Sequence, residues 1–239
     1  IRGVCWNTTG SPTIFDSYTS DGSGTGEFTS QITGLLDTTN YYVRAYATNS
    51  AGTAYGSQAI FSTNLTDVDG NIYKTVTIGS QVWLAENLKT TRLNNNTVIP
   101  EVTDNTVWSN TSTLAYCWIN NDEATYKPLY GALYNWYAIN TGNLCPTGWH
   151  VPSDSEYGDL ELELGIPPAE INTLGWRGTN QGTEMKTTTG WSAGENGTNT
   201  SGFSALPGGY RFALDGSFQA LGSFTYWWTS DFGDAVTTW

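Results

Sequence analysis

The chain has 239 residues, which is enough for one large domain or two small domains that each bury a core. Its 9 Lys and Arg residues stand against 22 Asp and Glu residues, and the net charge of −13 argues against nucleic acid and anionic membrane surfaces as partners. Only 13% of the residues are charged while 14% are aromatic, a balance typical of a β-rich extracellular protein. No apolar run is long enough to span a membrane, and both ends fall inside strand-like sequence, so we expect a fragment of a longer protein.

The N-terminal part carries a strand pattern of its own. Residues 41–47 alternate as in a strand, residues 49–52 supply a turn, and residues 54–61 predict a second strand. The stretch LLDTTNYYVRA, which begins at Leu35, fits the pattern L-x5-Y-x-V-x-A and resembles the corner before the F strand of a fibronectin type III domain. This resemblance implies a β-sandwich over residues 1–64 that lacks its first strand and serves as a spacer.

A second pattern starts near Leu65. Residues 72–78 and 81–84 alternate on either side of a Gly-Ser pair, which predicts a hairpin. The preceding residues Asp67, Asp69 and Asn71 have the spacing of a calcium loop, but its glycine and closing acid are out of place. We therefore interpret this loop as a solvated turn.

The stretch CPTGWHVPSDSEY, residues 145–157, contains the only histidine of the chain and raises the question of an active site. Ser153 and Glu156 form the S-x-x-E pattern of a capping box, and apolar residues then recur at helical spacing up to Leu164. Gly165 and two prolines end the pattern, so a helix is predicted over residues 154–164.

His150 lies between apolar neighbours, where we expect a hydrogen-bonded packing residue rather than a base. A Cys145/His150 nucleophile pair would need an orienting partner and an oxyanion site that the sequence does not display. We therefore predict no catalytic residue, no metal ligand and no enzyme activity.

Six blocks occur in order after residue 64: DVDGNIYKTVTIGSQVWLAENL, AYCWINND, YGALYNWYA, CPTGWHVPSDSEY, GFSALPGGYR and YWWTS. Together they resemble the Fibrobacter succinogenes major paralogous (FISUMP) domain, a family of surface-associated and lipoprotein modules of bacteria. GWHVPSDSEY is also similar to the helix start of C-type-lectin and formylglycine-generating-enzyme folds. The resemblance implies an α+β, C-type-lectin-like domain over residues 65–239, truncated at its C-terminus.

The formylglycine-generating relatives use a late pair of cysteines, and no cysteine follows Cys145 here, so their activity is not implied. The resemblance implies a disulfide between Cys145 and a cysteine beyond Trp239. Cys117 is the alternative partner within the chain, and Cys5 has the pattern of a small buried residue.

Aromatic rings beside amides and carboxylates are compatible with glycan binding. Five tryptophans in the family blocks are nevertheless expected in the core: Trp83, Trp118, Trp136, Trp149 and Trp228. Loop residues without a burial pattern are the predicted ligand-binding residues: Trp191, Glu195, Asn120, Asn121 and Asp122. Asp231 and Asp234 form a third polar cluster, where a C-type-lectin likeness would suggest calcium, but the ligand motif of those lectins is absent. No cofactor is therefore expected, with calcium the one alternative.

These features favour a non-catalytic binding or adhesion module, extracellular or on the outer cell surface, that recognises a glycan or a surface protein. The alternative is a structural subunit that packs against copies of itself in a surface fibre or filament. An enzyme is the third possibility.

Overall fold

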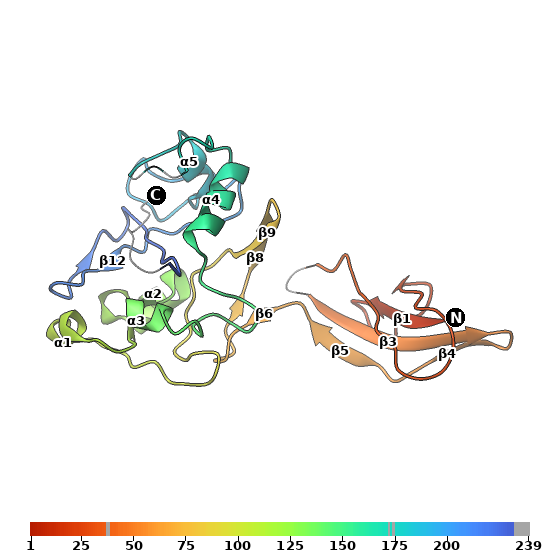
Figure 1. Ribbon diagram of the computed structural model, residues 1–239. Coiled ribbons are helices and arrows are strands. Elements are labelled where there is room, and N and C mark those ends of the chain that lie inside the picture. The colour runs from red at the N-terminus through yellow and green to blue at the C-terminus, as the bar shows by residue number, and fades with distance from the viewer. Residues whose placement is uncertain (37–38, 172, 174, 232–239) are drawn as a thin grey trace. The chain divides into compact units, whose positions relative to one another are not determined.

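The structure, a computed structural model, describes residues 1–36, 39–171, 173 and 175–231 (Figure 1). The chain divides into two compact units, Ile1–Leu65 and Thr66–Trp239, at the point where the strand pattern of the sequence changes. The described fold is mixed, with several small antiparallel sheets and a few short helices.

The first unit forms one five-stranded sheet in the order β2-β1-β3-β4, in which β5 also pairs with β3. Its strands are β1 (Arg2–Asn7), β2 (Ser17–Tyr18), β3 (Asn40–Asn49), β4 (Gly52–Tyr55) and β5 (Ala59–Ser62). The long strand β3 is the centre of the sheet, because β1 covers one edge while β4 and β5 share the other.

One expectation for this unit is wrong, and a second is not confirmed. The predicted strand over residues 54–61 is two strands, because the ladder on β3 is interrupted between Tyr55 and Ala59. The second sheet that a sandwich requires is not found among residues 1–36 and 39–65. The Tyr41 hydroxyl does accept a hydrogen bond from the Leu36 amide at 2.8 Å, a contact typical of a tyrosine corner. The fibronectin likeness stays a prediction.

The second unit contains two-stranded sheets and short helices. The strand pairs are β6 (Leu65–Thr66) with β7 (Ile72–Tyr73), β8 (Thr75–Ile78) with β9 (Gln81–Leu84), β10 (Tyr116–Cys117) with β11 (Leu133–Tyr134), and β12 (Tyr210–Arg211) with β13 (Phe218–Gln219). The helices are α1 (Asn105–Asn110), α2 (Glu123–Tyr130), α3 (Trp136–Ile139), α4 (Asp154–Glu163) and α5 (Gln181–Met185), with a 3-10 turn η1 (Ile119–Asn121). The β8–β9 pair confirms the predicted hairpin, but the predicted strand over residues 72–78 is two strands, because β7 pairs with β6 and β8 with β9.

Helix α4 confirms the capping prediction. The Ser153 hydroxyl accepts from the Glu156 amide at 3.3 Å, and the Glu156 carboxylate accepts from the Ser153 amide at 2.7 Å. The helix ends at Glu163, one residue before the predicted end, and Gly165 follows with a φ of +92° that favours glycine.

Two main core clusters lie in the second unit. The first joins the β8–β9 hairpin, α4 and α5 through Ile78, Trp83, Tyr157, Leu160, Met185, Trp191, Phe203 and Ala205. The second joins β10, β11 and α3 through Leu93, Ile99, Tyr116, Trp118, Tyr134, Ala138, Ile139 and Leu144. A small third cluster contains Trp108, Ala115 and Cys117. In Figure 1, α4 and α5 accordingly lie at one end of the unit and α1 to α3 at the other.

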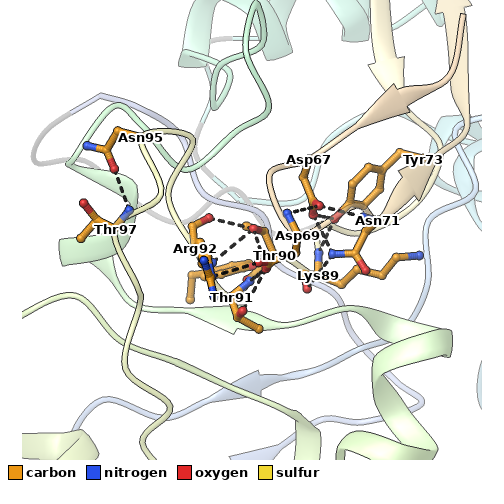
Figure 2. Close-up of polar contacts among 11 residues, drawn as sticks. Asp67, Asp69, Asn71, Tyr73, Lys89, Thr90, Thr91, Arg92, Asn95 and Thr97 are labelled. Atoms are coloured by element: carbon orange, nitrogen blue, oxygen red, sulfur yellow. Dashed lines mark hydrogen bonds and ion pairs between the residues drawn. The ribbon is translucent and has the colours of Figure 1, made fainter. Parts of the chain in front are cut away.

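The loop before β7 is a buried polar anchor, shown in Figure 2. Asp67 is buried, and its carboxylate accepts from the Asn71 amide at 2.9 Å and the Tyr73 hydroxyl at 2.6 Å. The Asp69 carboxylate accepts from the Thr91 amide at 2.5 Å and the Thr91 hydroxyl at 2.9 Å. The interpretation as a solvated turn is therefore wrong for Asp67, whose carboxylate is occupied by protein donors.

Among the helices of the described residues, none combines the length and the apolar character needed to cross a membrane.

The capping box gives a direct stability test. Ser153→Ala removes the hydroxyl that accepts from the Glu156 amide, and we expect it to lower the free energy of unfolding by about 1 kcal/mol in urea titrations. Ser155→Ala is the matched control, because Ser155 is exposed in the first turn of the same helix and should change stability by less than about 0.5 kcal/mol. Equal effects of both substitutions would contradict the capping role.

Candidate functional site

A cleft of about 1240 Å³ lies in the second unit between the two main core clusters. Trp83, Tyr157 and Phe203 line it from the first cluster, and Tyr134 and Ile139 line it from the second. Trp108 and five segments distant in sequence contribute its walls: 81–88, 130–139, 144–157, 203–213 and 225–231. The volume exceeds what a small ligand needs, because typical ligand pockets measure about 300–1,000 Å³.

Tryptophan rings form part of the cleft surface. Trp136 and Trp228 lie with their centroids 5.9 Å apart, and the Trp228 indole donates to the Tyr134 carbonyl at 2.8 Å. Trp228 is 43% exposed although its N–H is bonded to protein, so its ring is held in a fixed orientation.

The expectation that five tryptophans are core residues is therefore partly wrong. Trp83 and Trp118 are buried, whereas Trp136 and Trp149 are half-buried and Trp228 is exposed. The last three line the cleft, and their rings are partly exposed because they face it.

An acidic group sits at the rim of the cleft beside the histidine. His150 Nε2 lies 2.8 Å from Glu156 Oε1, and both residues line the cleft. The Ser153 amide, followed by the His150 ring, holds the pKa of Glu156 below its usual value. The predicted packing role of His150 is wrong, because its ring is exposed and pairs with the helix-capping carboxylate.

The segment 225–231 runs from β12 to the start of α4 and is held by hydrogen bonds at both ends. The Gly209 amide donates to the Phe224 carbonyl at 2.8 Å, and Gly209 also bridges to Thr225. Beyond Trp228, the Ser230 amide donates to the Pro152 carbonyl at 2.8 Å. The Asp231 carboxylate accepts from the Asp154 amide at 2.5 Å, which places an anion at the positive end of α4. Asp234 lies outside the described residues.

Arg211 is buried in the cleft wall and has a structural role. Its guanidinium stacks over Trp108 at 4.6 Å and over Phe218 at 4.9 Å. It donates to the carbonyl oxygens of Val102, Thr103 and Gly216 and to the Asn105 side chain. The guanidinium keeps its positive charge, but the carboxylates of Glu86, Glu156 and Asp231 outnumber it among the charged groups that line the cleft. The lining is therefore net negative.

All three cysteines are free, so the predicted alternative of a Cys117–Cys145 disulfide is wrong. Cys145 lines the cleft, and burial raises the pKa of its thiol to about 11. At neutral pH it is a protonated thiol and a weak nucleophile. Cys5 is buried as expected, with its thiol donating to the Pro12 carbonyl at 3.3 Å.

The predicted loop residues lie elsewhere. Trp191 is only 8% exposed, and its indole donates to the Ala205 carbonyl at 3.2 Å within the first core cluster. The expectation that Trp191 is presented to solvent is therefore wrong. Glu195 is exposed, and its carboxylate lies 3.7 Å from Lys186 Nζ, which also stacks over the Trp191 ring at 4.6 Å.

Asn120, Asn121 and Asp122 are exposed at the start of α2 and have local partners. Asn120 and Asn121 adopt φ values of 53° and 55°, a conformation that asparagine tolerates better than most residues. The Asp122 carboxylate caps α2 by accepting from the Thr125 amide at 3.0 Å, and this bond lowers the pKa of Asp122. None of the five predicted residues lines the cleft, and a ligand-binding role for the exposed four stays a prediction.

In the part of the chain that the structure describes, no group of three His, Cys, Asp or Glu side chains is arranged to hold a metal ion.

Comparison with known families decides the identity of this region. The model of the Fibrobacter succinogenes major domain matches residues 76–239, more than half of the chain, and the match contains every segment of the cleft. The chain belongs to this family. The FISUMP resemblance is thereby confirmed, whereas the C-type-lectin and formylglycine-generating-enzyme likenesses stay predictions. No curated protein and no solved structure matches the chain.

The sequence contained no specific signal for the cleft of this Fibrobacter succinogenes major domain. In TYWWTS the four residues from Thr225 to Trp228 do not alternate between polar and apolar, and only Thr225 is buried. A short continuous apolar run is equally typical of a buried strand, so this pattern does not predict the mixed exposure of the rings.

The buried position of Trp191 predicts a large stability effect. Trp191→Ala should lower the free energy of unfolding by about 3–5 kcal/mol, because it opens a cavity in the first core cluster. Trp176→Ala is the control, since Trp176 is 68% exposed and should melt close to the native temperature. Thermal unfolding of the two variants checks this, and a native melting temperature for Trp191→Ala would contradict the assigned burial.

Glu156 predicts an acid-dependent loss of stability. Because its pKa is lowered in the folded chain, the carboxylate stabilises the fold above its unfolded pKa, and this stabilisation disappears as the pH falls through the folded pKa. The stability difference between the native chain and Glu156→Gln should therefore be constant near neutral pH and shrink below about pH 4.5 in urea titrations. A difference that grows with acid would contradict the assignment.

Proposed function

We propose that the second unit is a non-catalytic binding module that takes a glycan in the aromatic cleft. The observation that carries this proposal is the pair of rings Trp136 and Trp228, held 5.9 Å apart on the cleft surface with one indole bonded to the wall. Flat rings in fixed positions stack on the C–H faces of sugars at little cost in side-chain entropy.

The polar groups of the cleft support a neutral sugar. Glu156 and Asp231 have lone pairs beyond those used by their protein donors, and the Asn87 amide oxygen adds an acceptor for sugar hydroxyl groups. Because carboxylates outnumber the single guanidinium in the cleft lining and the chain has a net charge of −13, an anionic polymer would be repelled.

The same groups favour reversible binding over catalysis. The Cys145 thiol is protonated near neutral pH, and the Glu156 carboxylate is shared between the helix cap and His150. A catalytic site needs a nucleophile or base with a placed partner and a free position for the reacting atom. A binding function requires neither a nucleophile nor a base with a placed partner.

In this proposal the protein acts at the cell exterior, and the first unit is its spacer. A single sheet rich in hydroxyl side chains suits a spacer that holds the binding unit away from a surface. The second candidate is a fibre subunit that packs against copies of itself, in which the exposed side chains of Phe15, Leu36 and Ile60 would supply apolar contacts.

Trp228→Ala tests the glycan proposal. Calorimetric titration of the whole chain with neutral β-linked hexasaccharides of glucose, mannose and xylose should reveal binding to at least one, and the substitution should weaken it by about tenfold or more. Tyr137→Ala is the matched control, because Tyr137 on α3 has the same exposed fraction, 43%, but does not line the cleft.

Three other outcomes would contradict non-catalytic glycan binding in the cleft. Binding that survives Trp228→Ala but is lost in Glu195→Ala or Asn120→Ala would move the site to the predicted loops. Cleavage of a hexasaccharide that disappears in Glu156→Gln would establish an enzyme instead. Self-association without sugar binding, measured by sedimentation, would favour the fibre subunit.

A further inference from the structure

A row of aromatic rings runs from the cleft to the outer surface of the second unit. Its members are Phe212, Tyr210, Tyr226, Phe224 and Trp176, and neighbouring ring centroids lie 6.3, 4.9, 6.4 and 6.1 Å apart in that order. We call this row the aromatic strip. The first three residues line the cleft, whereas Phe224 and Trp176 lie beyond its lining.

The outer end of the strip is open to solvent. Trp176 is 68% exposed and Phe224 is exposed beside it. Contiguous exposed rings are uncommon on monomeric proteins and mark interaction sites, because leaving that apolar area in water is unfavourable.

The strip offers ring faces in sequence. Among the three outer rings, Trp176 is tilted by 39° against Phe224, and Phe224 by 35° against Tyr226. Tyr210 then meets Tyr226 edge-on at 77°, and its hydroxyl donates to the Gln219 side chain at 2.8 Å. Polar groups therefore border the rings, as the hydroxyls of a sugar require.

We propose that the aromatic strip extends the ligand site out of the cleft, and that the ligand is a linear, uncharged polysaccharide chain. This inference rests on the proposed glycan-binding function and specifies its substrate class. A single sugar would use the cleft alone, whereas Phe224 and Trp176 continue the aromatic surface from Tyr226 beyond the cleft, where the further rings of a polymer would lie. The acidic cleft disfavours uronic acid and sulfated polymers.

A chain-length comparison tests the strip. Calorimetric titration of the native chain with disaccharides and hexasaccharides of β-linked glucose, mannose and xylose should give tighter binding of at least one hexasaccharide. Trp176→Ala should weaken hexasaccharide binding by about three- to tenfold and leave disaccharide binding unchanged, because only the longer chain reaches the outer ring. Phe224→Ala should act in the same direction, and Tyr137→Ala should change neither affinity.

The outcomes separate this inference from the proposed function. If Trp228→Ala weakens both sugars while Trp176→Ala changes neither, the cleft binds a short glycan and the strip proposal is overturned. If no sugar binds the native chain, both proposals fail. If Trp176→Ala instead abolishes self-association seen in sedimentation, the strip is a contact between copies of the chain and the polysaccharide proposal is overturned. Melting curves of each variant verify that the compared proteins are folded.

Discussion

The cleft depends on the way in which segment 225–231 is fastened to the rest of the second unit. Backbone hydrogen bonds hold it to β12 through Gly209 and to the start of α4 through Pro152, and the Trp228 indole is bonded to the Tyr134 carbonyl. These hydrogen bonds pair backbone and indole groups that would otherwise bind water. They hold the large rings in fixed positions at the cleft surface. A rigid aromatic surface between two core clusters is the consequence on which the binding proposal depends.

Local features of the fold followed from the sequence because their causes are local. The capping box at Ser153 and the stop at Gly165 lie within a few residues of the helix that they delimit, and the β8–β9 hairpin needs only its own alternation and turn. The split of the predicted strand into β4 and β5 was missed, because it arises from pairing with two halves of β3. The buried Asp67 was missed for a similar reason, since its partner Tyr73 is in turn held by Lys89.

The site was predicted less well than the fold, because the cleft is built from Trp108 and five segments that lie far apart in the sequence. A local sequence pattern cannot show that they meet. Trp191 lies in a loop rich in glycine and asparagine, and its burial comes from contacts with α5 and β8–β9 rather than from any periodicity. His150 was expected to pack, yet its partner Glu156 is six residues away on a helix that turns the carboxylate toward it. The sequence did indicate a surplus of rings beside amides and acids, and such groups line the cleft, whereas their binding of a glycan stays a prediction.

A crystal structure of the whole chain with a bound neutral hexasaccharide tests the central claim most directly. The account predicts ordered sugar rings in the cleft, with one ring against Trp136 and Trp228 and the chain continuing toward Phe224 and Trp176. A sugar that is ordered only at the loop of Glu195, or on the sheet of the first unit, would contradict it.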